Sequence, residues 1–323
     1  MFKFIPFEKS GVGTEEWDNF VKGSDNGTIF HTKRFLSYHL KSRFKDSSIA
    51  VFKDDKLFSV FSATEIKNGG KKIFSSHSGA SYGGFVYNIN LNLKDAFELV
   101  DGLLNYAREF KYDKIQITLP PIIYESKYSS YIDFALIKRD FNYLKREISS
   151  VVQLDIKEGQ LLSTYRAEAR TAVNKSIKKG VVIKECDAFD DYYEILKKNL
   201  KLRHNVNPTH TVEELKKLKK MFPDEIRLWG AFLDKKLIAG VCNFSANSKV
   251  VLAFYISHNE DYQEYRAVNL LFYEIMKKYQ EEGFRFLDFG IFTVNMEPNW
   301  GLARFKENFG ARGIFRDTLY KDL

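Results

Sequence analysis

The chain has few of the residues that mark secreted, metal-binding or membrane-spanning proteins. Its 323 residues include only two cysteines, Cys186 and Cys242, which lie in strand-like segments and match no ligand spacing. We therefore expect two buried, reduced thiols and no metal site. No apolar run is long enough to cross a bilayer, and Met1–Ser10 lacks the apolar core of a signal peptide. These absences predict a cytoplasmic protein.

Aromatic and basic residues are abundant instead. The sequence has 29 Phe and 18 Tyr, and 44% of its residues are hydrophobic, which is enough for two globular domains with separate cores. The formal net charge of +8 suggests an anionic partner, such as a nucleotide-linked donor, a tRNA or a lipid phosphate. The alternative is that most lysines belong to solvated helix surfaces, as in residues 213–220, and charge alone does not decide between them.

The two halves of the chain repeat one pattern. Val51–Leu57, with a turn at Asp54-Asp55, resembles Ala231–Leu237, and each segment predicts a hairpin. In both halves a further strand, an amphipathic helix and a short strand follow. The predicted helices cover Leu93–Phe110 and Tyr265–Glu282, and the short strands cover Lys114–Leu119 and Arg285–Phe289. We therefore predict an α+β fold that arose by duplication, with mixed, mainly antiparallel sheets flanked by helices.

An additional helical section lies between the halves. Gln160–Lys179 has the spacing of one basic amphipathic helix, with Gly180 in the position of a C-cap. A second helix is predicted over Phe189–Leu202, and the Thr-x-x-Glu pattern at Thr211–Glu214 predicts the capped start of a third. We place the domain boundary near Ser149, so that the domains cover residues 1–148 and 149–323.

The predicted strand Val250–Ser257 enters a helix through a loop. Free N–H groups and the helix dipole make such a helix start a natural anion site, although a plain connection looks the same in sequence. The loop has no glycine, so we expect any diphosphate there to depend on Arg266. The candidate donor-binding residues are Tyr255, Ser257, Gln263, Arg266, Ala267, Val268 and Phe305.

Two motifs carry a family resemblance. Gly-Leu-x-Arg-Phe-Lys-x-x-Phe-Gly at 301–310 is similar to the C-terminal signature of the Fem-type aminoacyltransferases and their acetyltransferase relatives. The basic stretch 166–181 resembles the one that opens their second domain. The resemblance implies two tandem GNAT-like (acyl-CoA N-acyltransferase) domains, with a degenerate first domain that forms one wall of the acceptor cleft and a catalytic second domain. It also implies that Lys306 lies beside the reacting centre, where an ammonium could stabilise an oxyanion.

Two polar loops are candidates for binding the acceptor and removing its proton. Residues 202–211 place His204 and His210 in a turn, where either could act as the base, as could Asp288 on a predicted buried strand; helix capping explains His210 equally well. Ser75–Gly84, rich in glycine and serine, resembles the Fem-type segment that faces the acceptor. The candidate acceptor-binding residues are Tyr82, Gly83, Gly84, Arg203, Asn205, Thr209 and Asn295.

We therefore expect transfer of an acyl group from acyl-CoA to an amine of an envelope precursor such as an amino sugar. No Ser-His-Asp or Cys-His arrangement is evident, so the amine would attack directly in a ternary complex, and no cofactor is expected to be permanently bound. One alternative is a Fem-type enzyme that transfers an aminoacyl group from tRNA to a peptidoglycan precursor. An alternative of another class is a non-catalytic protein that binds nucleic acid or anions through residues 166–179.

Overall fold

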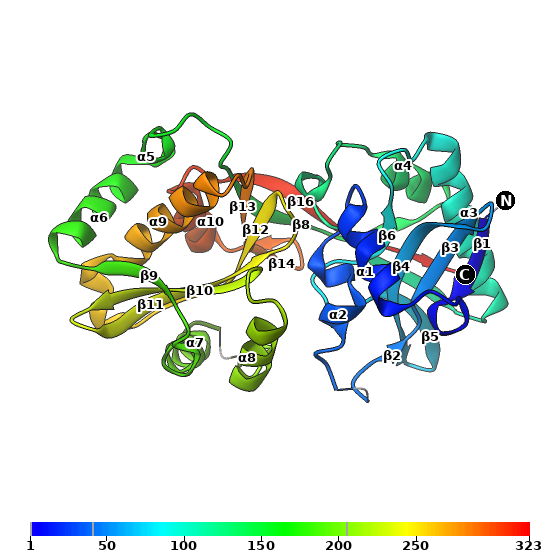
Figure 1. Ribbon diagram of the computed structural model, residues 1–323, viewed down its shortest axis with the longest axis horizontal. Coiled ribbons are helices and arrows are strands. Elements are labelled where there is room, and N and C mark those ends of the chain that lie inside the picture. The colour runs from blue at the N-terminus through cyan, green and yellow to red at the C-terminus, as the bar shows by residue number, and fades with distance from the viewer. Residues whose placement is uncertain (1, 41, 205) are drawn as a thin grey trace. The chain divides into compact units, whose positions relative to one another are not determined.

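The computed structural model describes residues 2–40, 42–204 and 206–323, and the side chains of Arg203 and His204 fall outside this description. The chain divides into two compact units (Figure 1). Unit 1 comprises Met1–Glu147 and Phe315–Leu323, and unit 2 comprises Ile148–Ile314. The first border lies one residue from the expected one, whereas the last residues group with unit 1 although the sequence suggested the C-terminal domain.

Unit 1 contains a mixed sheet in the order β1-β3-β4-β5-β7-β16, and β2 and β6 also pair with β4. Helices α3 and α4 pack on one face, and α1 packs on the other through Trp17 and Val21. The strands are β1 (Phe2–Pro6), β2 (Lys45–Asp46), β3 (Ile49–Lys53), β4 (Lys56–Asn68), β5 (Lys71–Ser76), β6 (Gly84–Tyr87), β7 (Lys114–Thr118) and the unit 1 part of β16 (Arg312–Asp322). The helices are α1 (Thr14–Gly23), α2 (Lys33–Leu36), α3 (Leu93–Glu109) and α4 (Tyr131–Lys138).

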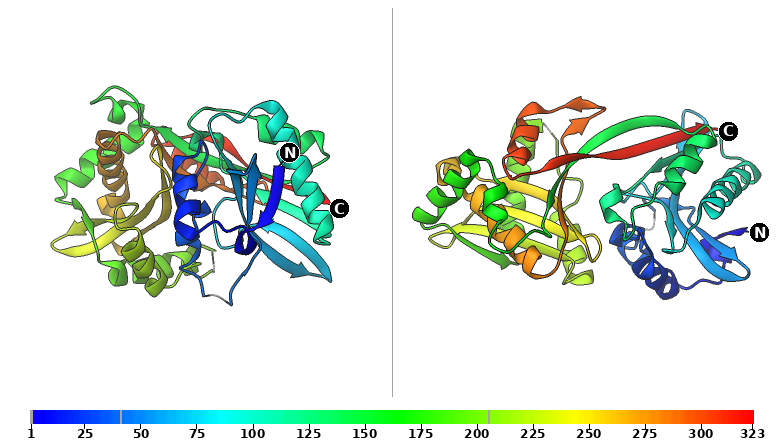
Figure 2. Two further views of the ribbon diagram at one scale, coloured as in Figure 1. Left: turned by 45° about the vertical axis from the view of Figure 1, so that its right-hand side comes forward. Right: turned by 90° about the horizontal axis from the view of Figure 1, so that it is seen from above.

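Unit 2 contains a sheet in the order β8-β13-β12-β11-β10-β9. Helices α6 and α9 cover one face and α7 and α8 the other (Figures 1 and 2). The strands are β8 (Asn142–Gln153, in unit 2 from Ile148), β9 (Val182–Cys186), β10 (Ile226–Leu233), β11 (Lys236–Ser245), β12 (Val250–His258), β13 (Phe286–Ile291), β14 (Thr293–Val294) and β15 (Glu297–Pro298). The helices are α5 (Leu161–Thr164), α6 (Ala167–Lys178), α7 (Phe189–His204), α8 (Val212–Met221), α9 (Ala267–Glu281) and α10 (Trp300–Glu307).

The hairpins of the internal repeat have the same local geometry. Both turns, Asp54-Asp55 and Asp234-Lys235, have positive φ at their two central residues, as the tightest hairpins require. The register shifts once in each hairpin, directly after Val51 in unit 1 and Ala231 in unit 2. Each sheet is mixed and mainly antiparallel, so the predicted fold class is confirmed.

The repeat differs at the strand that follows each hairpin. In unit 2, β12 continues along β11 with a bulge at Phe254, because Cys242 pairs with Tyr255 and Asn243 with Ala253. In unit 1 the corresponding strand is split into β5 and β6, which pair with successive parts of β4. The segment 77–83 therefore occupies in unit 1 the place of a single bulged residue in unit 2.

The helix predicted over Gln160–Lys179 is two helices. Tyr165 and Arg166 interrupt it with extended backbone, because the Tyr165 ring is buried against Phe309 and the Arg166 amide donates to the Asn308 carbonyl. The C-cap at Gly180, with φ of 78°, is confirmed. Among the described residues, no helix combines the length and the apolar composition that spanning a membrane requires.

Candidate functional site in unit 2

Lys306 is the most unusual side chain of unit 2. It lies on α10 within the signature 301–310, yet only 2% of the residue is exposed. Its Nζ donates hydrogen bonds to the carbonyls of Gly290 and Ile291, at 2.7 and 2.8 Å. Burial lowers the pKa of Lys306 to about 8, although the nearby Asp288 carboxylate opposes the shift. A helix-surface lysine, the alternative that the sequence allowed, is therefore excluded.

Asp288 lies on β13 and is fully buried. Its carboxylate accepts hydrogen bonds from the Ser149 hydroxyl at 2.5 Å and the Gly290 amide at 2.7 Å. Gly290 has φ of 72°, a conformation that glycine adopts without strain. Asp288 thus holds the end of β13 in the shape that presents two carbonyls to Lys306, and this position suits a positioning role better than that of a base.

The helix start expected to bind an anion is present at α9. Arg266 immediately precedes the helix in the left-handed conformation, with φ of 55°, and no side chain caps the first turn. The first N–H groups of a helix have no partner within the helix, so this end remains electropositive. The exposed Arg266 side chain forms no ion pair or hydrogen bond with any described residue. A non-glycine residue therefore holds the left-handed position directly before this helix.

Cations and rings border the same loop. Lys179, next to the end of α6, pairs with Glu264 at 2.6 Å and lies 4.5 Å from the centre of the Tyr265 ring. Among the other donor-binding candidates, Gln263 is exposed and Ala267 is buried, whereas Val268 and Phe305 are half-buried. Ser257 is 2% exposed, and its hydroxyl has no partner among the described residues.

His210 and Tyr255 form a polar cluster at the bulge of β12. The Tyr255 hydroxyl lies 2.9 Å from His210 Nδ1 and 2.6 Å from the Thr209 hydroxyl. The His210 ring also packs edge-on against Phe254, and its carbonyl accepts from the Tyr193 hydroxyl. Burial raises the pKa of Tyr255, while hydrogen bonds from Thr209 and His210 oppose the shift. The fold thus brings together three residues that the sequence assigned to different roles.

The acceptor candidates of unit 1 have packing roles. Tyr82 is 2% exposed, and its hydroxyl lies 3.3 Å from that of Tyr124. A Cβ on Gly83 would lie 2.5 Å from the Ser76 Cβ, and Gly84 has φ of 102° at the start of β6. These glycines are therefore required by the split strand.

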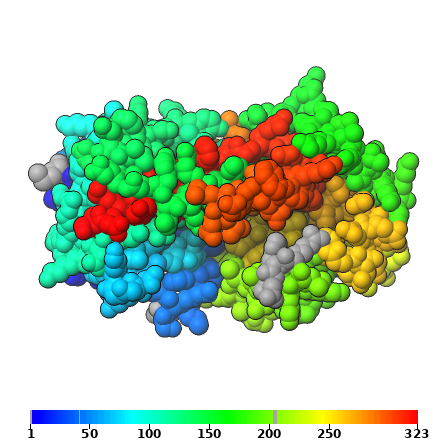
Figure 3. All heavy atoms as spheres, turned by 180° about the vertical axis from the view of Figure 1, so that it is seen from behind, coloured from blue at the N-terminus to red at the C-terminus, as the bar shows by residue number. Residues whose placement is uncertain are grey.

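The remaining candidates are dispersed or not described. Asn205 lies outside the described residues, and the side chains of Arg203 and His204 are likewise outside them. Asn295 forms, with φ of 52°, the tight turn between β14 and β15. The segment that holds this hairpin and α10, in orange, is on the surface in Figure 3. Trp300, the first residue of α10, is 77% exposed. Within the described part of the chain, no three His, Cys, Asp or Glu side chains cluster as metal ligands would.

Comparison with known proteins agrees with this arrangement. Residues 163–307 match the sequence model of a family described as the acetyltransferase (GNAT) domain. Unit 2 contains a GNAT domain. This domain makes the protein an enzyme of the transferase class rather than the non-catalytic binding protein that was one alternative. No curated protein sequence matches the chain.

Solved structures show that the GNAT fold extends over both units. The crystal structure of FemX superposes with a TM-score of 0.77 at 15% identity and covers 99% of this chain and 97% of its own. The C-terminal domain of a protein assigned as lysylphosphatidylglycerol synthetase from Agrobacterium fabrum has a TM-score of 0.61 at 12% identity, covering 96% and 91%. A tandem GNAT protein from the clavulanic acid biosynthesis pathway has a TM-score of 0.57 at 10% identity, covering 100% and 98%. The chain therefore has a tandem GNAT fold, as the resemblance implied.

Proposed function

We propose that the protein is an N-acyltransferase that moves an acyl group from acyl-CoA to an amine of a cell-envelope precursor such as an amino sugar. The observation that carries the proposal is the buried Lys306, because an ammonium enclosed by protein stabilises a developing oxyanion more strongly than one in water. Two of its three N–H groups are directed at the carbonyls of Gly290 and Ile291. The third has no acceptor among the described residues and is assigned to the substrate oxygen.

The reaction proceeds by direct attack. The amine nitrogen of the acceptor forms a bond to the thioester carbonyl carbon, and the carbonyl oxygen becomes an oxyanion that Lys306 stabilises. Collapse of this intermediate breaks the C–S bond and releases the thiolate of CoA. His210, whose Nδ1 lies 2.9 Å from the Tyr255 hydroxyl, is assigned to take the amine proton, with Tyr255 passing a proton to the thiolate.

The helix start at α9 is the proposed donor site. Its uncapped first turn and the exposed Arg266 favour the diphosphate of CoA. Arg266 takes the left-handed position, so the backbone can turn toward a phosphate there without glycine. We assign the neighbouring Gln263, Ala267 and Val268 to the same contact. The enzyme would act in the cytoplasm, where acyl-CoA is available.

Aminoacyl transfer is the second candidate. The A. fabrum structure carries a name that denotes the joining of lysine to phosphatidylglycerol, and the fold likeness to FemX points in the same direction. A tRNA would also suit the basic residues 166–179 of this chain. The acceptor of such a reaction would be a peptidoglycan precursor or a lipid phosphate.

A donor comparison tests both candidates. Native mass spectrometry of protein taken from cells should reveal bound CoA, and purified protein should then transfer a labelled acetyl group from acetyl-CoA to glucosamine. Transfer from a charged tRNA to a lipid-linked or nucleotide-linked muropeptide, with none from acetyl-CoA, would replace the first candidate by the second. Absence of transfer from both donors would refute the proposed acyl transfer.

A further inference from the structure

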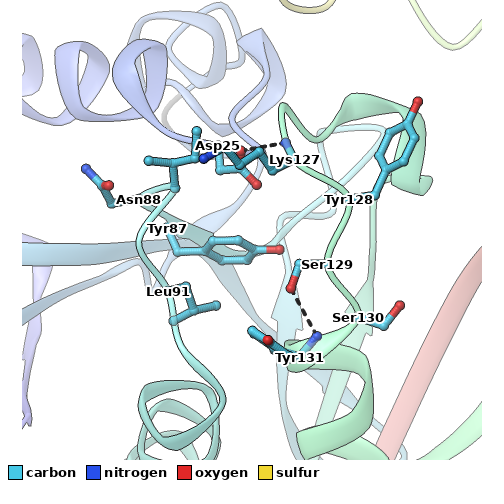
Figure 4. A pocket seen from close by; sticks show the side chains of 10 residues that line it. Asp25, Tyr87, Asn88, Leu91, Lys127, Tyr128, Ser129, Ser130 and Tyr131 are labelled. Carbon is cyan, nitrogen blue, oxygen red and sulfur yellow. Dashed lines mark hydrogen bonds between the residues drawn. The ribbon is translucent and has the colours of Figure 1, made fainter.

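A cavity of about 340 Å³ opens in unit 1, and none of the residues that line it is assigned to acyl transfer (Figure 4). It lies between the segment that follows β6 and the segment that precedes α4. Pockets that hold small molecules begin at about 300 Å³, so this volume suits a ligand as large as an amino acid or a monosaccharide. The residues that line it include Asp25, Tyr87, Leu91, Lys127, Tyr128 and Tyr131.

The internal repeat relates this cavity to the donor loop of unit 2. Tyr87 ends β6 at the position where His258 ends β12. The helix that follows in unit 1 is α3, and its start is not available to an anion. The Asn92 side chain already caps it by accepting a hydrogen bond from the Asp95 amide. The Asp95 carboxylate in the first turn also repels negative charge. The repeated position therefore does not bind phosphate in unit 1, and a different ligand chemistry is needed.

Asp25 supplies an anion at the base of the cavity. The residue is 4% exposed, and one of its carboxylate oxygens accepts from the Lys127 amide at 3.0 Å. The other oxygen has no partner among the described residues and points into the space beside the Tyr87 ring (Figure 4). No described lysine, arginine or histidine pairs with this carboxylate. A buried, uncompensated charge is costly, so a cation that enters the cavity would be stabilised.

A second buried carboxyl adds to the negative potential. Glu125 is 8% exposed and accepts from the Tyr87 hydroxyl at 2.9 Å and from the Ser129 amide at 2.7 Å. Burial raises the pKa of Glu125 to about 7, and both hydrogen bonds oppose the shift. Glu125 therefore anchors the Tyr87 ring across the cavity, and Asp25 is left as the group that meets the ligand.

Aromatic rings form the walls and the rim. Tyr128 and Tyr131 are 54% and 43% exposed, and Leu91 adds an apolar side chain next to the buried Tyr87. Ring faces attract ammonium groups and pack against the apolar faces of small polar molecules. The lining thus combines the Asp25 carboxylate with tyrosine side chains, and it also includes the polar residues Asn88, Lys127, Ser129 and Ser130.

We propose that this cavity is a second ligand site, which binds a small primary amine through an ammonium–Asp25 hydrogen bond with Tyr87, Tyr128 and Tyr131 around its frame. The site goes beyond the proposed acyl transfer, because it binds the amine as a cation, and a protonated nitrogen cannot attack a carbonyl. The internal repeat has therefore replaced an anion-binding position in unit 2 by a cation-binding position in unit 1.

Calorimetry on the full chain at pH 7 tests the site with D-glucosamine and its uncharged counterpart N-acetyl-D-glucosamine. We expect wild type to bind glucosamine and to bind the N-acetyl compound at least about tenfold more weakly, because the charge-assisted hydrogen bond is lost. Asp25→Asn, which retains an acceptor for the Lys127 amide, should weaken glucosamine binding by a similar factor. Asp54→Asn, an exposed turn position, is the matched control and should bind as wild type does.

Two further variants distinguish binding in this cavity from binding at the catalytic site. Tyr128→Ala changes an exposed ring, so it should fold even if Asp25→Asn does not, and it should weaken glucosamine binding severalfold. Lys306→Met should leave this binding unchanged while it reduces acyl transfer. Equal binding of the two sugars, or loss of binding in Lys306→Met but not in Asp25→Asn or Tyr128→Ala, would overturn the proposal. Failure of acyl transfer alone would not affect it.

Discussion

At the scale of the residue, Lys306 carries both stability and the proposed chemistry. We predict that Lys306→Met reduces turnover roughly a hundredfold, the loss expected for one oxyanion donor. Above pH 10.5, where Lys306 is neutral in the folded and the unfolded chain, the variant should also lose about 1–3 kcal/mol of stability, because the carbonyls of Gly290 and Ile291 each lose a donor. Steady-state rates and urea unfolding measure the two effects separately. Lys277→Met, at an exposed position of α9, is the control, and an unchanged rate in Lys306→Met would remove Lys306 from the mechanism.

The lowered pKa of Lys306 predicts that the stability of the protein depends on pH. The pKa of Lys306 is about 8 in the folded chain and 10.5 in its ordinary state, so the folded chain binds fewer protons between these values. The contribution of Lys306 to the free energy of unfolding therefore rises from pH 8 to 10.5. Wild type should gain stability over this range relative to Lys306→Met, as measured by urea unfolding at each pH.

The rate should change in the opposite direction over that range. Above about pH 8 the Nζ loses its charge, so acyl transfer should fall by up to about tenfold per pH unit. In Lys306→Arg the guanidinium remains charged, so the residual rate should show no such fall. A fall of the rate at the same pH in wild type and in Lys306→Arg would assign the titration to another group.

At the scale of the element, the start of α9 makes a test of the donor site possible. Arg266→Ala removes the guanidinium and should weaken acetyl-CoA binding by about tenfold in calorimetry, the loss expected for one charge-assisted hydrogen bond. Arg266→Gly removes the same group but relieves the left-handed backbone, which should recover about 1 kcal/mol of stability relative to the alanine variant. It also allows the backbone to approach the phosphate more closely, so we expect it to bind more tightly than Arg266→Ala.

The control for these variants is Lys277→Ala, which alters a charge on the same helix several turns from its start. Its affinity for acetyl-CoA should equal that of wild type. If wild type gives no heat with acetyl-CoA but binds a charged tRNA, the donor assignment is wrong and the aminoacyl-transfer candidate replaces it.

At the scale of the whole molecule, unit 1 completes its sheet with a strand from the C-terminal end of the chain. Residues 315–322 of β16 belong to unit 1 and pair with β7 from Thr318 onward, whereas unit 2 begins with residues 148–153 of β8, which pair with β13. Leu319 is 1% exposed in the unit 1 core, and Asp317 pairs with Arg146. The C-terminal residues are therefore part of the N-terminal unit.

We predict that, in a chain ending at Ile314, the backbone amides of unit 1 lose protection from hydrogen exchange before those of unit 2. Removal of β16 exposes the β7 backbone and deletes Leu319, and a buried leucine alone accounts for about 2–5 kcal/mol. Hydrogen exchange followed by mass spectrometry should show faster exchange in β7 and α3 than in β12 and α9. Removal of Leu323 alone is the control. Equal exchange in β7 of the shortened and full-length chains would contradict this account.

Local sequence patterns were sufficient for most of the elements. The hairpins follow from alternating apolar residues and from turns that accept positive φ, and the start of α8 follows from Thr211 and Glu214, whose reciprocal hydrogen bonds are present. The left-handed Gly180 ends α6 as predicted. These features depend on residues within a few positions of one another, so they can be predicted from the sequence alone. The division into two repeated units followed from the same patterns.

The candidate sites depend on contacts that no local pattern contains. Asp288 meets Ser149 from 139 positions away, and the carbonyls that hold Lys306 belong to a strand 15 and 16 residues before it. Asp25 meets Lys127 across 102 positions. Side chains so far apart in the sequence come together only when the sheets form and helices pack on them. Burial then shifts the pKa of the titratable ones. The sequence could name Lys306 as a candidate, but its enclosure, its lowered pKa and the amine-sized cavity of unit 1 arise from packing between distant segments.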